Sequence, residues 1–194
     1  MHFKLIKNTV LLFVSIYFVA SFSKKFNAHY DLKQKIKSTQ NLKVGANQLE
    51  ILLPELKNKS IGIVANQTSV IFKNFFESNT KSEYTHLVDS LISLGVDIKK
   101  VFAPEHGYKG ISDAGEFIED GLDIKTGLKI VSLYGKNKKP NAEMLEDIDL
   151  IIFDIQGVGA RFYTYLSTLH YMMEACANMD VPIILLDRPN PNAH

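Results

Sequence analysis

Residues Asp149–Gln156 read DLIIFDIQ, and the architecture of the protein can be worked out from this stretch. Its apolar part, Asp149–Phe153, is short and shows little alternation of apolar and polar residues. Such a run is typical of a strand that is covered on both faces, as in a parallel sheet. Further strand-like runs occur at Ser60–Ala65 (SIGIVA), Lys99–Ala103 (KKVFA), Lys129–Leu133 (KIVSL) and Val181–Leu186 (VPIILL).

Helical patterns lie between these runs. Tyr84–Leu94 carries leucines at i, i+4 and i+7 and is followed by Gly95, a common helix stop. Ala142–Asp147, behind Pro140, and Tyr165–Met179 are the other expected helices. Alternating strands and helices predict an α/β fold with an open, mostly parallel sheet and helices on both faces.

Composition excludes several classes of protein. The 194 residues are 46% hydrophobic and 22% charged, with 22 basic and 21 acidic side chains. This balance excludes a disordered chain and argues against a nucleic-acid partner. The one cysteine, Cys176, excludes an internal disulfide and is expected to be a buried helix residue. The basic residues include only two arginines, Arg161 and Arg188.

The first 23 residues have the layout of a secretory signal peptide. Lysines precede an apolar run from Val10 to Ala20, and small residues follow it. The run is short for a membrane-spanning helix, which needs about 20 residues, so a cleaved signal is favoured over an uncleaved anchor. After cleavage, no stable insertion into the membrane is expected. We expect a polar linker over residues 24–43, a folded domain over residues 44–194, and export to the periplasm or the cell exterior.

Polar residues follow four of the five expected strands. In open parallel sheets, ligands bind beyond the carboxyl ends of the strands. Turn chemistry alone explains any one of these segments, but four at one edge, with both arginines nearby, predict an anionic or polyhydroxy ligand. The segments are Asn66–Ser69, Pro104–Gly107, Asp154–Gly157 and Asp187–Asn190.

Cleavage of a glycosidic bond is one chemistry that these residues fit. It needs two carboxyl groups, or one and a group of the substrate, beside the bond. Glu105 is the best candidate acid, because partial burial after an apolar strand would raise its pKa. His106 could orient a partner or transfer protons itself. Candidate second carboxylates, for each of which a turn-capping role also suffices, are Asp113, Glu116, Asp154 and Asp187.

Other chemistries fit less well. A metal site could use Glu105, His106, Asp113 and Asp154, but metal-ligand spacings such as His-x-x-x-His are missing, and no metal is predicted. The segment Gly157–Gly159 lacks the third glycine of the dinucleotide fingerprint, so a tight turn is expected there and no cofactor is predicted. His86 and His170 lie in the expected helices and are interpreted as structural.

Seven short motifs occur in order between about Val44 and Pro191. They are Val64–Thr68 (VANQT), Phe102–Gly107 (FAPEHG), Asp113–Gly115 (DAG), Ser132–Gly135 (SLYG), Phe153–Gln156 (FDIQ), Gly159–Tyr165 (GARFYTY) and Leu186–Pro191 (LDRPNP). Together they resemble the exo-β-N-acetylmuramidases of the NamZ type. The resemblance implies a glycoside hydrolase that releases N-acetylmuramic acid from the non-reducing end of peptidoglycan fragments.

The resemblance also implies a Rossmann-like first domain, a smaller second domain and an active site in the cleft between them. By matching position, Glu105 would be the catalytic acid with His106 beside it. The substrate's lactyl carboxylate would suit an arginine, and peptidoglycan-derived muramyl saccharides are the expected partners. The residues that would line the pocket are Asn66, Gln156, Arg161, Tyr163 and Arg188.

Two features depart from the family pattern. Gly157 stands where the family usually has Asp, which would impair this copy if that Asp contributes to catalysis or binding. The chain stops at His194, whereas family members continue, so the second domain is expected to be missing from a fragment or truncated product. Two alternatives stay open: a non-catalytic domain that binds cell-wall sugars, and a different hydrolase of phosphorylated or acidic substrates.

Overall fold

The computed structural model describes residues 43–73, 83–110 and 120–192. The predicted signal, residues 24–42 of the predicted linker, and the candidate carboxylates Asp113 and Glu116 lie outside the described residues. No helix within the described ranges is both long enough and apolar enough to cross a membrane.

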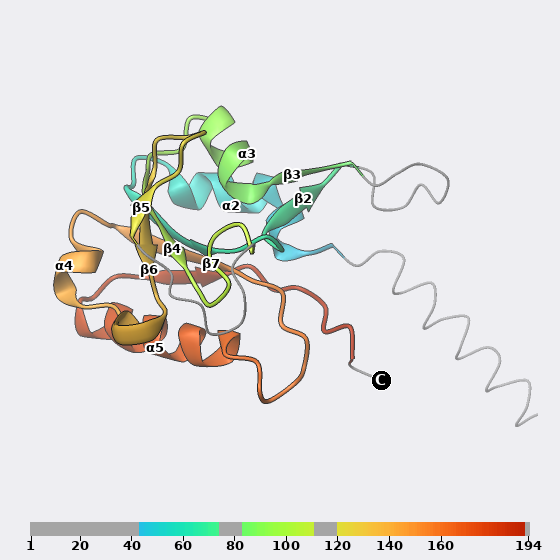
Figure 1. Ribbon diagram of the computed structural model, residues 1–194. Helices are drawn as coiled ribbons and strands as arrows, with labels where there is room; N and C mark the ends of the chain where they lie inside the picture. Colours follow the sequence, from blue (N-terminus) through green and yellow to red (C-terminus); the bar gives the residue numbers. More distant parts are fainter. Residues whose placement is uncertain (1–42, 74–82, 111–119, 193–194) are drawn as a thin grey trace, which may run out of the picture. The chain divides into compact units, whose positions relative to one another are not determined.

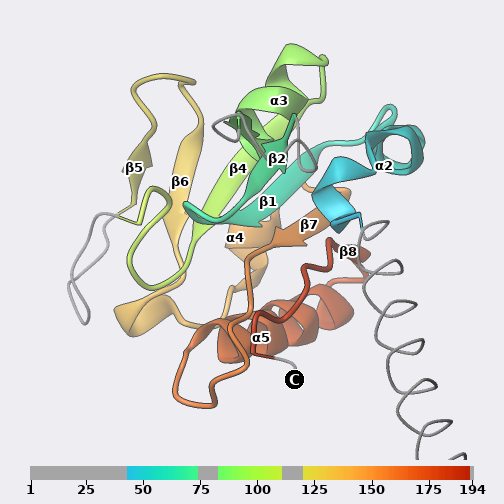
Figure 2. The ribbon, with the colours of Figure 1, turned by 90° about the vertical axis from the view of Figure 1, so that its right-hand side faces the viewer.

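A six-stranded sheet in the order β5-β6-β4-β1-β7-β8 forms the centre of the domain (Figure 2). All neighbouring strands in it are parallel except the edge pair β5 and β6. The predicted open, mostly parallel sheet is therefore confirmed, and each of the five predicted runs overlaps a strand. The strands are β1 (Ile61–Ala65), β4 (Ile98–Ala103), β5 (Gly121–Leu122), β6 (Lys129–Ser132), β7 (Leu150–Asp154) and β8 (Ile183–Leu185).

Helices cover both faces of this sheet, as predicted (Figure 1). Alternate residues of β7 serve the two layers: Leu150 and Ile152 pack in one buried cluster, and Ile151 and Phe153 pack in the other. This double burial explains why the strand sequences do not alternate. The helices on the first face are α2 (Leu49–Leu56) and α3 (Leu87–Ser93), and those on the second are α4 (Ala142–Leu145) and α5 (Tyr165–Asn178).

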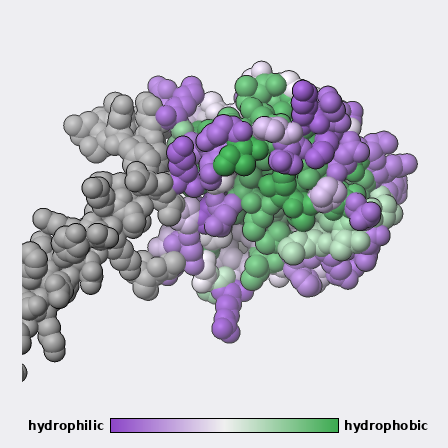
Figure 3. Space-filling view, turned by 180° about the vertical axis from the view of Figure 1, so that it is seen from behind, coloured by the Kyte–Doolittle hydropathy of each residue, from purple (hydrophilic) through white to green (hydrophobic). Residues whose placement is uncertain are grey.

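The buried clusters supply most of the stabilisation. Ile63, Val101 and Ile152 are fully buried, as is Met172 on α5. Burial of one such side chain stabilises the fold by about 1.5–3 kcal/mol. Cys176 is also buried on α5, as expected, and burial raises the pKa of its thiol to about 11. Seen from behind, the domain shows hydrophobic residues gathered in the middle of one face with hydrophilic residues around them (Figure 3).

Several local details differ from the sequence prediction. The segment expected to be helical from Tyr84 begins as a strand, β3 (Tyr84–His86), which pairs antiparallel with β2 (Val70–Phe72). The helix starts at Leu87 because His86 caps it, with Nδ1 accepting a hydrogen bond from the Val88 backbone N–H. Helix α2 and the short 3-10 helices Gly45–Asn47 and Gly135–Asn137 were also not predicted.

Helix α4 is shorter than its predicted range, Ala142–Asp147. Asn141 caps its first turn by accepting a hydrogen bond from the Met144 backbone N–H at 2.9 Å. The helix ends at Leu145, and Asp147 has a φ of 60° in the left-handed region. A residue in that conformation cannot continue a right-handed helix, so the chain turns there into β7.

Candidate functional site

The carboxyl ends of β1, β4, β7 and β8 lie at one edge of the sheet. Ala65, the last residue of β1, pairs with Asp154, the last residue of β7. Phe153 in turn pairs with Leu185, the last residue of β8. The predicted meeting of four polar segments at this edge therefore follows from the strand register.

A tight turn after β1 holds Asn66, which is fully buried. Its Oδ1 accepts hydrogen bonds from the Thr68 backbone N–H at 2.9 Å and from Thr68 Oγ1 at 2.6 Å. The backbone N–H of Asn66 donates to Ser69 Oγ at 3.0 Å, and its carbonyl lies 2.9 Å from His86 Nε2. The amide nitrogen of Asn66, Nδ2, is buried and has no hydrogen-bond partner within the described ranges.

The His86 side chain supports this turn by a hydrogen bond to the Asn66 carbonyl. Its Nδ1 accepts from the Val88 N–H, so Nε2 carries the proton that is donated to the Asn66 carbonyl. Burial lowers the pKa of His86, against the raising effect of that hydrogen bond. The Tyr108 ring packs edge-on against it at 5.0 Å between ring centroids. His86 is the last residue of β3 and not part of a helix as predicted, and its contacts with the Asn66 turn and with the start of α3 are structural.

Asp154 and Arg188 form a buried ion pair behind the edge. Arg188 Nε lies 2.6 Å from Asp154 Oδ1, and Arg188 Nη2 lies 2.9 Å from Oδ2. Arg188 Nη2 also donates to the Val70 carbonyl at 2.9 Å, and its side chain is 3% exposed. Burial raises the pKa of Asp154, and the guanidinium opposes that rise. The donors of Arg188 are thus directed into the protein, and a role in substrate binding stays a prediction.

Gln156 connects the β7 end to the segment after β8. Its Nε2 donates to the Pro189 carbonyl at 2.8 Å, and its backbone N–H donates to Thr68 Oγ1 at 3.0 Å. Nearby, Gly159 has a φ of 71°, and a Cβ there would lie 2.4 Å from Asn190 Nδ2. The tight turn predicted for Gly157–Gly159 therefore requires glycine at 159. At Gly157 a Cβ would meet nothing within 4 Å.

Glu105 follows β4 and is half-buried. Thr164 Oγ1 donates to its Oε2 at 2.7 Å. Glu105 also faces the Tyr134 hydroxyl, whose pKa is raised by desolvation first and then by the carboxylate. A cavity of about 240 Å³ opens here, lined by Glu105, Tyr134, Thr164, Lys138, Leu133, Ser167, Thr168 and Tyr171.

His106, next to Glu105, has a φ of 69°. This left-handed conformation is uncommon for a residue with a Cβ and costs on the order of 1–3 kcal/mol, and such residues concentrate at functional sites. Gly107 follows with a φ of 77°. Two successive left-handed residues turn the chain sharply just after Glu105, which fixes the carboxylate at the strand end.

The loop before α5 carries the remaining predicted residues. Arg161 is exposed, and within the described ranges no ion pair or hydrogen bond engages it. Tyr163 is 45% exposed and lies between the rings of Phe162 and Tyr165, with centroids 5.5 Å and 6.0 Å away. A second cavity, of about 260 Å³, adjoins this loop and includes Tyr165, Gly157 and Asn190 in its lining.

Several site residues were not singled out from the sequence. Thr68, Tyr134, Thr164 and Tyr165 lie within the quoted motifs, but their hydroxyl groups reach the site through contacts across the fold. Of the predicted second carboxylates, Asp154 is held by Arg188 and Asp187 is exposed. Among the described residues, no group of three or more His, Cys, Asp or Glu side chains is placed to hold a metal ion.

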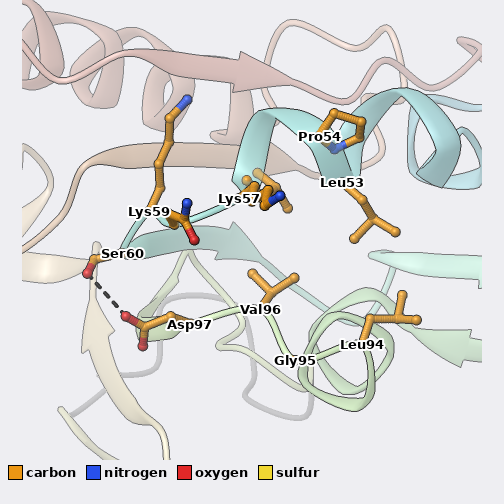
Figure 4. Close-up of a pocket in the computed structure, with 11 residues that line it drawn as sticks. Leu53, Pro54, Lys57, Lys59, Ser60, Leu94, Gly95, Val96 and Asp97 are labelled. Carbon is orange, nitrogen blue, oxygen red and sulfur yellow. Dashed lines mark hydrogen bonds between the residues drawn. The ribbon is translucent and has the colours of Figure 1, made fainter.

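A larger cavity of about 690 Å³ lies at the opposite end of β1 (Figure 4). It is bordered by Leu53 and Pro54 of α2 and by Leu94 and Val96 after α3. Ser60 Oγ donates to Asp97 Oδ2 at 3.2 Å at its edge. This cavity is at the amino ends of the strands, whereas ligands of open parallel sheets bind at the carboxyl ends. Its size therefore does not make it the candidate active site.

Comparisons with known proteins agree with the motifs. Residues 61–194 match the family model described as exo-beta-N-acetylmuramidase NamZ, N-terminal. The chain is 41% identical over 147 residues to the peptidoglycan beta-N-acetylmuramidase NamZ of Bacillus subtilis (strain 168). That match covers 74% of this chain and 33% of the relative, so the chain spans about a third of the relative's length.

Two crystal structures of DUF1343 family proteins from Bacteroides fragilis NCTC 9343 share the fold. They align with TM-scores of 0.64 and 0.59, at 37% and 38% sequence identity. Each alignment covers 77% of this chain and 35% of the other. With the family match over residues 61–194, the conclusion is that this chain belongs to the family of the N-terminal domain of NamZ exo-β-N-acetylmuramidases.

Proposed function

We propose that the protein acts as a glycoside hydrolase that releases N-acetylmuramic acid from the non-reducing end of peptidoglycan fragments. The observation that carries the proposal is Glu105, held by Thr164 beside a cavity at the carboxyl edge of the sheet. The family relationship and the name of the Bacillus subtilis relative support the substrate class.

In this proposal Glu105 is the general acid. A protonated carboxyl group beside the glycosidic oxygen can transfer its proton as the bond breaks, which contributes about 10²- to 10⁴-fold to the rate. Thr164 fixes one oxygen, Oε2, by hydrogen bonding. His106 adjoins the carboxyl group in the chain, and its strained backbone keeps both residues at the strand end.

Arg161 is the arginine best placed to bind the lactyl carboxylate of muramic acid. Its guanidinium is exposed at the edge, and a planar fork of donors matches a carboxylate. The exposed ring of Tyr163 follows two residues later and offers an apolar face to a sugar. The sugar binds against the turn that holds Asn66 and against the strand end that carries Gln156. Arg188 acts indirectly, through its ion pair with Asp154.

We also propose that the protein is exported, because residues 1–23 have the layout of a signal peptide and because peptidoglycan lies outside the cytoplasm. A fusion of residues 1–43 to alkaline phosphatase, which is active only after export, tests this. Phosphatase activity is expected for the fusion and is expected to disappear when Val14 and Phe18 are both replaced by Asp. An inactive wild-type fusion would contradict export.

The test of the enzymatic function uses the full-length gene product and a chromogenic β-N-acetylmuramide. We expect release of the chromophore, and no release from the matching β-N-acetylglucosaminide, which lacks the lactyl group. Absence of release from both substrates would overturn the proposal. Calorimetry with muramic-acid fragments then decides the alternative, because binding without turnover indicates a sugar-binding domain.

A further inference from the structure

Thr68 connects two of the predicted substrate-binding residues, although it was not predicted as a site residue. Its hydroxyl donates to Asn66 Oδ1 at 2.6 Å and accepts from the Gln156 backbone N–H at 3.0 Å. Its own backbone N–H donates to the same Asn66 oxygen at 2.9 Å. One side chain thus couples the turn after β1 to the end of β7.

These bonds determine which way the Asn66 amide points. A backbone N–H can only donate, so the atom that faces it must be the oxygen Oδ1 and not the nitrogen Nδ2. The hydroxyl proton of Thr68 goes to the same oxygen, because an amide oxygen can only accept, and the hydroxyl oxygen accepts from the Gln156 N–H. The Nδ2 group of Asn66 is therefore turned to the other side, away from the turn.

Among the described residues, Nδ2 is buried and has no hydrogen-bond partner. An unpaired buried donor costs about 1–3 kcal/mol, so such groups in native proteins call for an explanation. Catalytic hydrogen bonds are often long or unformed in the free enzyme and tighten when substrate binds, so an unpaired donor at the ligand edge of the sheet points to an acceptor on the ligand.

We infer that Thr68 is a positioning residue that fixes the Asn66 amide, so that Nδ2 is kept as an unpaired donor for an acceptor oxygen of the saccharide. The direction of the chain follows from the donors: Gln156 N–H donates to Thr68 Oγ1, and Thr68 O–H donates to Asn66 Oδ1. Nδ2 can then donate only to an acceptor such as a carbonyl, carboxylate or ether oxygen. This inference rests on the proposed function for the identity of the ligand.

The test compares Thr68→Val, which keeps the shape of the side chain, with Thr68→Ser, which keeps the hydroxyl group. On the chromogenic muramide, Thr68→Val is expected to lower kcat/KM about tenfold or more, and Thr68→Ser is expected to restore most of it. Equal kcat/KM values for Thr68→Val and the wild type would overturn the inference. So would equal losses in Thr68→Val and Thr68→Ser.

Asn66→Asp tests the donor role of Nδ2. Aspartate keeps the oxygen that accepts from Thr68 and replaces the NH2 group. We expect this variant to lose activity at least as much as Thr68→Val and to have a lowered Tm, because an unpaired carboxylate oxygen is then buried. Full activity of Asn66→Asp would contradict the donor role.

A readout without turnover distinguishes failure of this inference from failure of the proposed function. In nitrogen-15 NMR spectra of the full-length protein, the two Asn66 side-chain amide protons are expected to be distinct and protected from exchange in the wild type and in Thr68→Ser. In Thr68→Val they are expected to exchange with solvent. If the wild type releases no chromophore, the proposed function fails, and the exchange result still decides the role of Thr68.

Discussion

Thr164 donates a hydrogen bond of 2.7 Å from Oγ1 to Oε2 of Glu105, across 59 residues of sequence. It joins the loop before α5 to the turn after β4, and both residues line the cavity of about 240 Å³. The carboxylate of Glu105, the candidate acid, is therefore held by a residue from a segment distant in the sequence.

Removal of this bond should lower the rate more than it lowers stability. Hydrogen bonds to charged groups contribute about 1.5–3 kcal/mol, so Thr164→Val is expected to reduce kcat by about 10- to 100-fold. Thr164→Ser keeps the donor and is expected to remain within a few-fold of the wild type. Steady-state kinetics of both variants measure the effect. Equal kcat values for Thr164→Val and the wild type would show that this contact does not position Glu105.

The two arginines should respond differently to substitution. Arg188→Met leaves Asp154 buried without its partner, which is expected to lower the free energy of unfolding by about 3–5 kcal/mol in urea titrations. Arg161→Met, at an exposed position, is expected to change stability by no more than about 0.5 kcal/mol while raising KM for the muramide. An unchanged KM for Arg161→Met would remove Arg161 from the substrate site.

The stability of the protein should fall as the pH is lowered, because His86 is buried in its neutral form. Burial lowers the pKa of His86 below its ordinary value of 6.5, so the unfolded chain binds the proton more tightly than the folded chain does. The contribution is complete above pH 6.5 and is lost as the pH falls through the unfolded and then the folded pKa. Urea titrations between pH 7.5 and 5.5 should show this loss, and His86→Gln should reduce the slope. His170→Gln, on the exposed side of α5, is the control; a slope unchanged in His86→Gln would contradict the assignment.

Gly157 should accept an aspartate without strain. Its Cβ would meet nothing within 4 Å, whereas Gly159 is left-handed and in contact with Asn190. Gly157→Asp, the residue that the family resemblance places here, is expected to keep or raise stability by about 0.4–1 kcal/mol and to raise kcat/KM. Gly157→Ala controls for the backbone, and Gly159→Ala is expected to be destabilised. A drop in activity for Gly157→Asp would show that this copy works without the carboxylate.

The sheet could be predicted from the sequence because each strand is a compact apolar run that the fold buries on both faces. The hairpin of β2 and β3 could not, since each strand has three residues and Tyr84–His86 continues directly into the leucine pattern of α3. The pairing of Tyr84–His86 with β2 and the cap from the His86 side chain decide where that helix begins.

The edge of the site was predictable, but the direction of its side chains was not. The sequence placed Arg188, with its five N–H donors, after the last strand, and the structure directs its Nε and Nη2 donors to Asp154. The hydrogen bond from Thr164 to Glu105 could not be predicted from the sequence, because it depends on how α5 packs against the sheet. Motif residues can be located from the sequence, whereas their partners depend on the tertiary fold.

The central claim is that Glu105 supplies the proton that breaks the glycosidic bond. The most direct measurement is the turnover of Glu105→Gln on the chromogenic β-N-acetylmuramide, with Glu55→Gln on the exposed side of α2 as the matched control. We predict that Glu105→Gln loses about 10²- to 10⁴-fold in kcat with an unchanged Tm, and that Glu55→Gln keeps the wild-type rate. A Glu105→Gln variant that cleaves the muramide at the wild-type rate would contradict the claim.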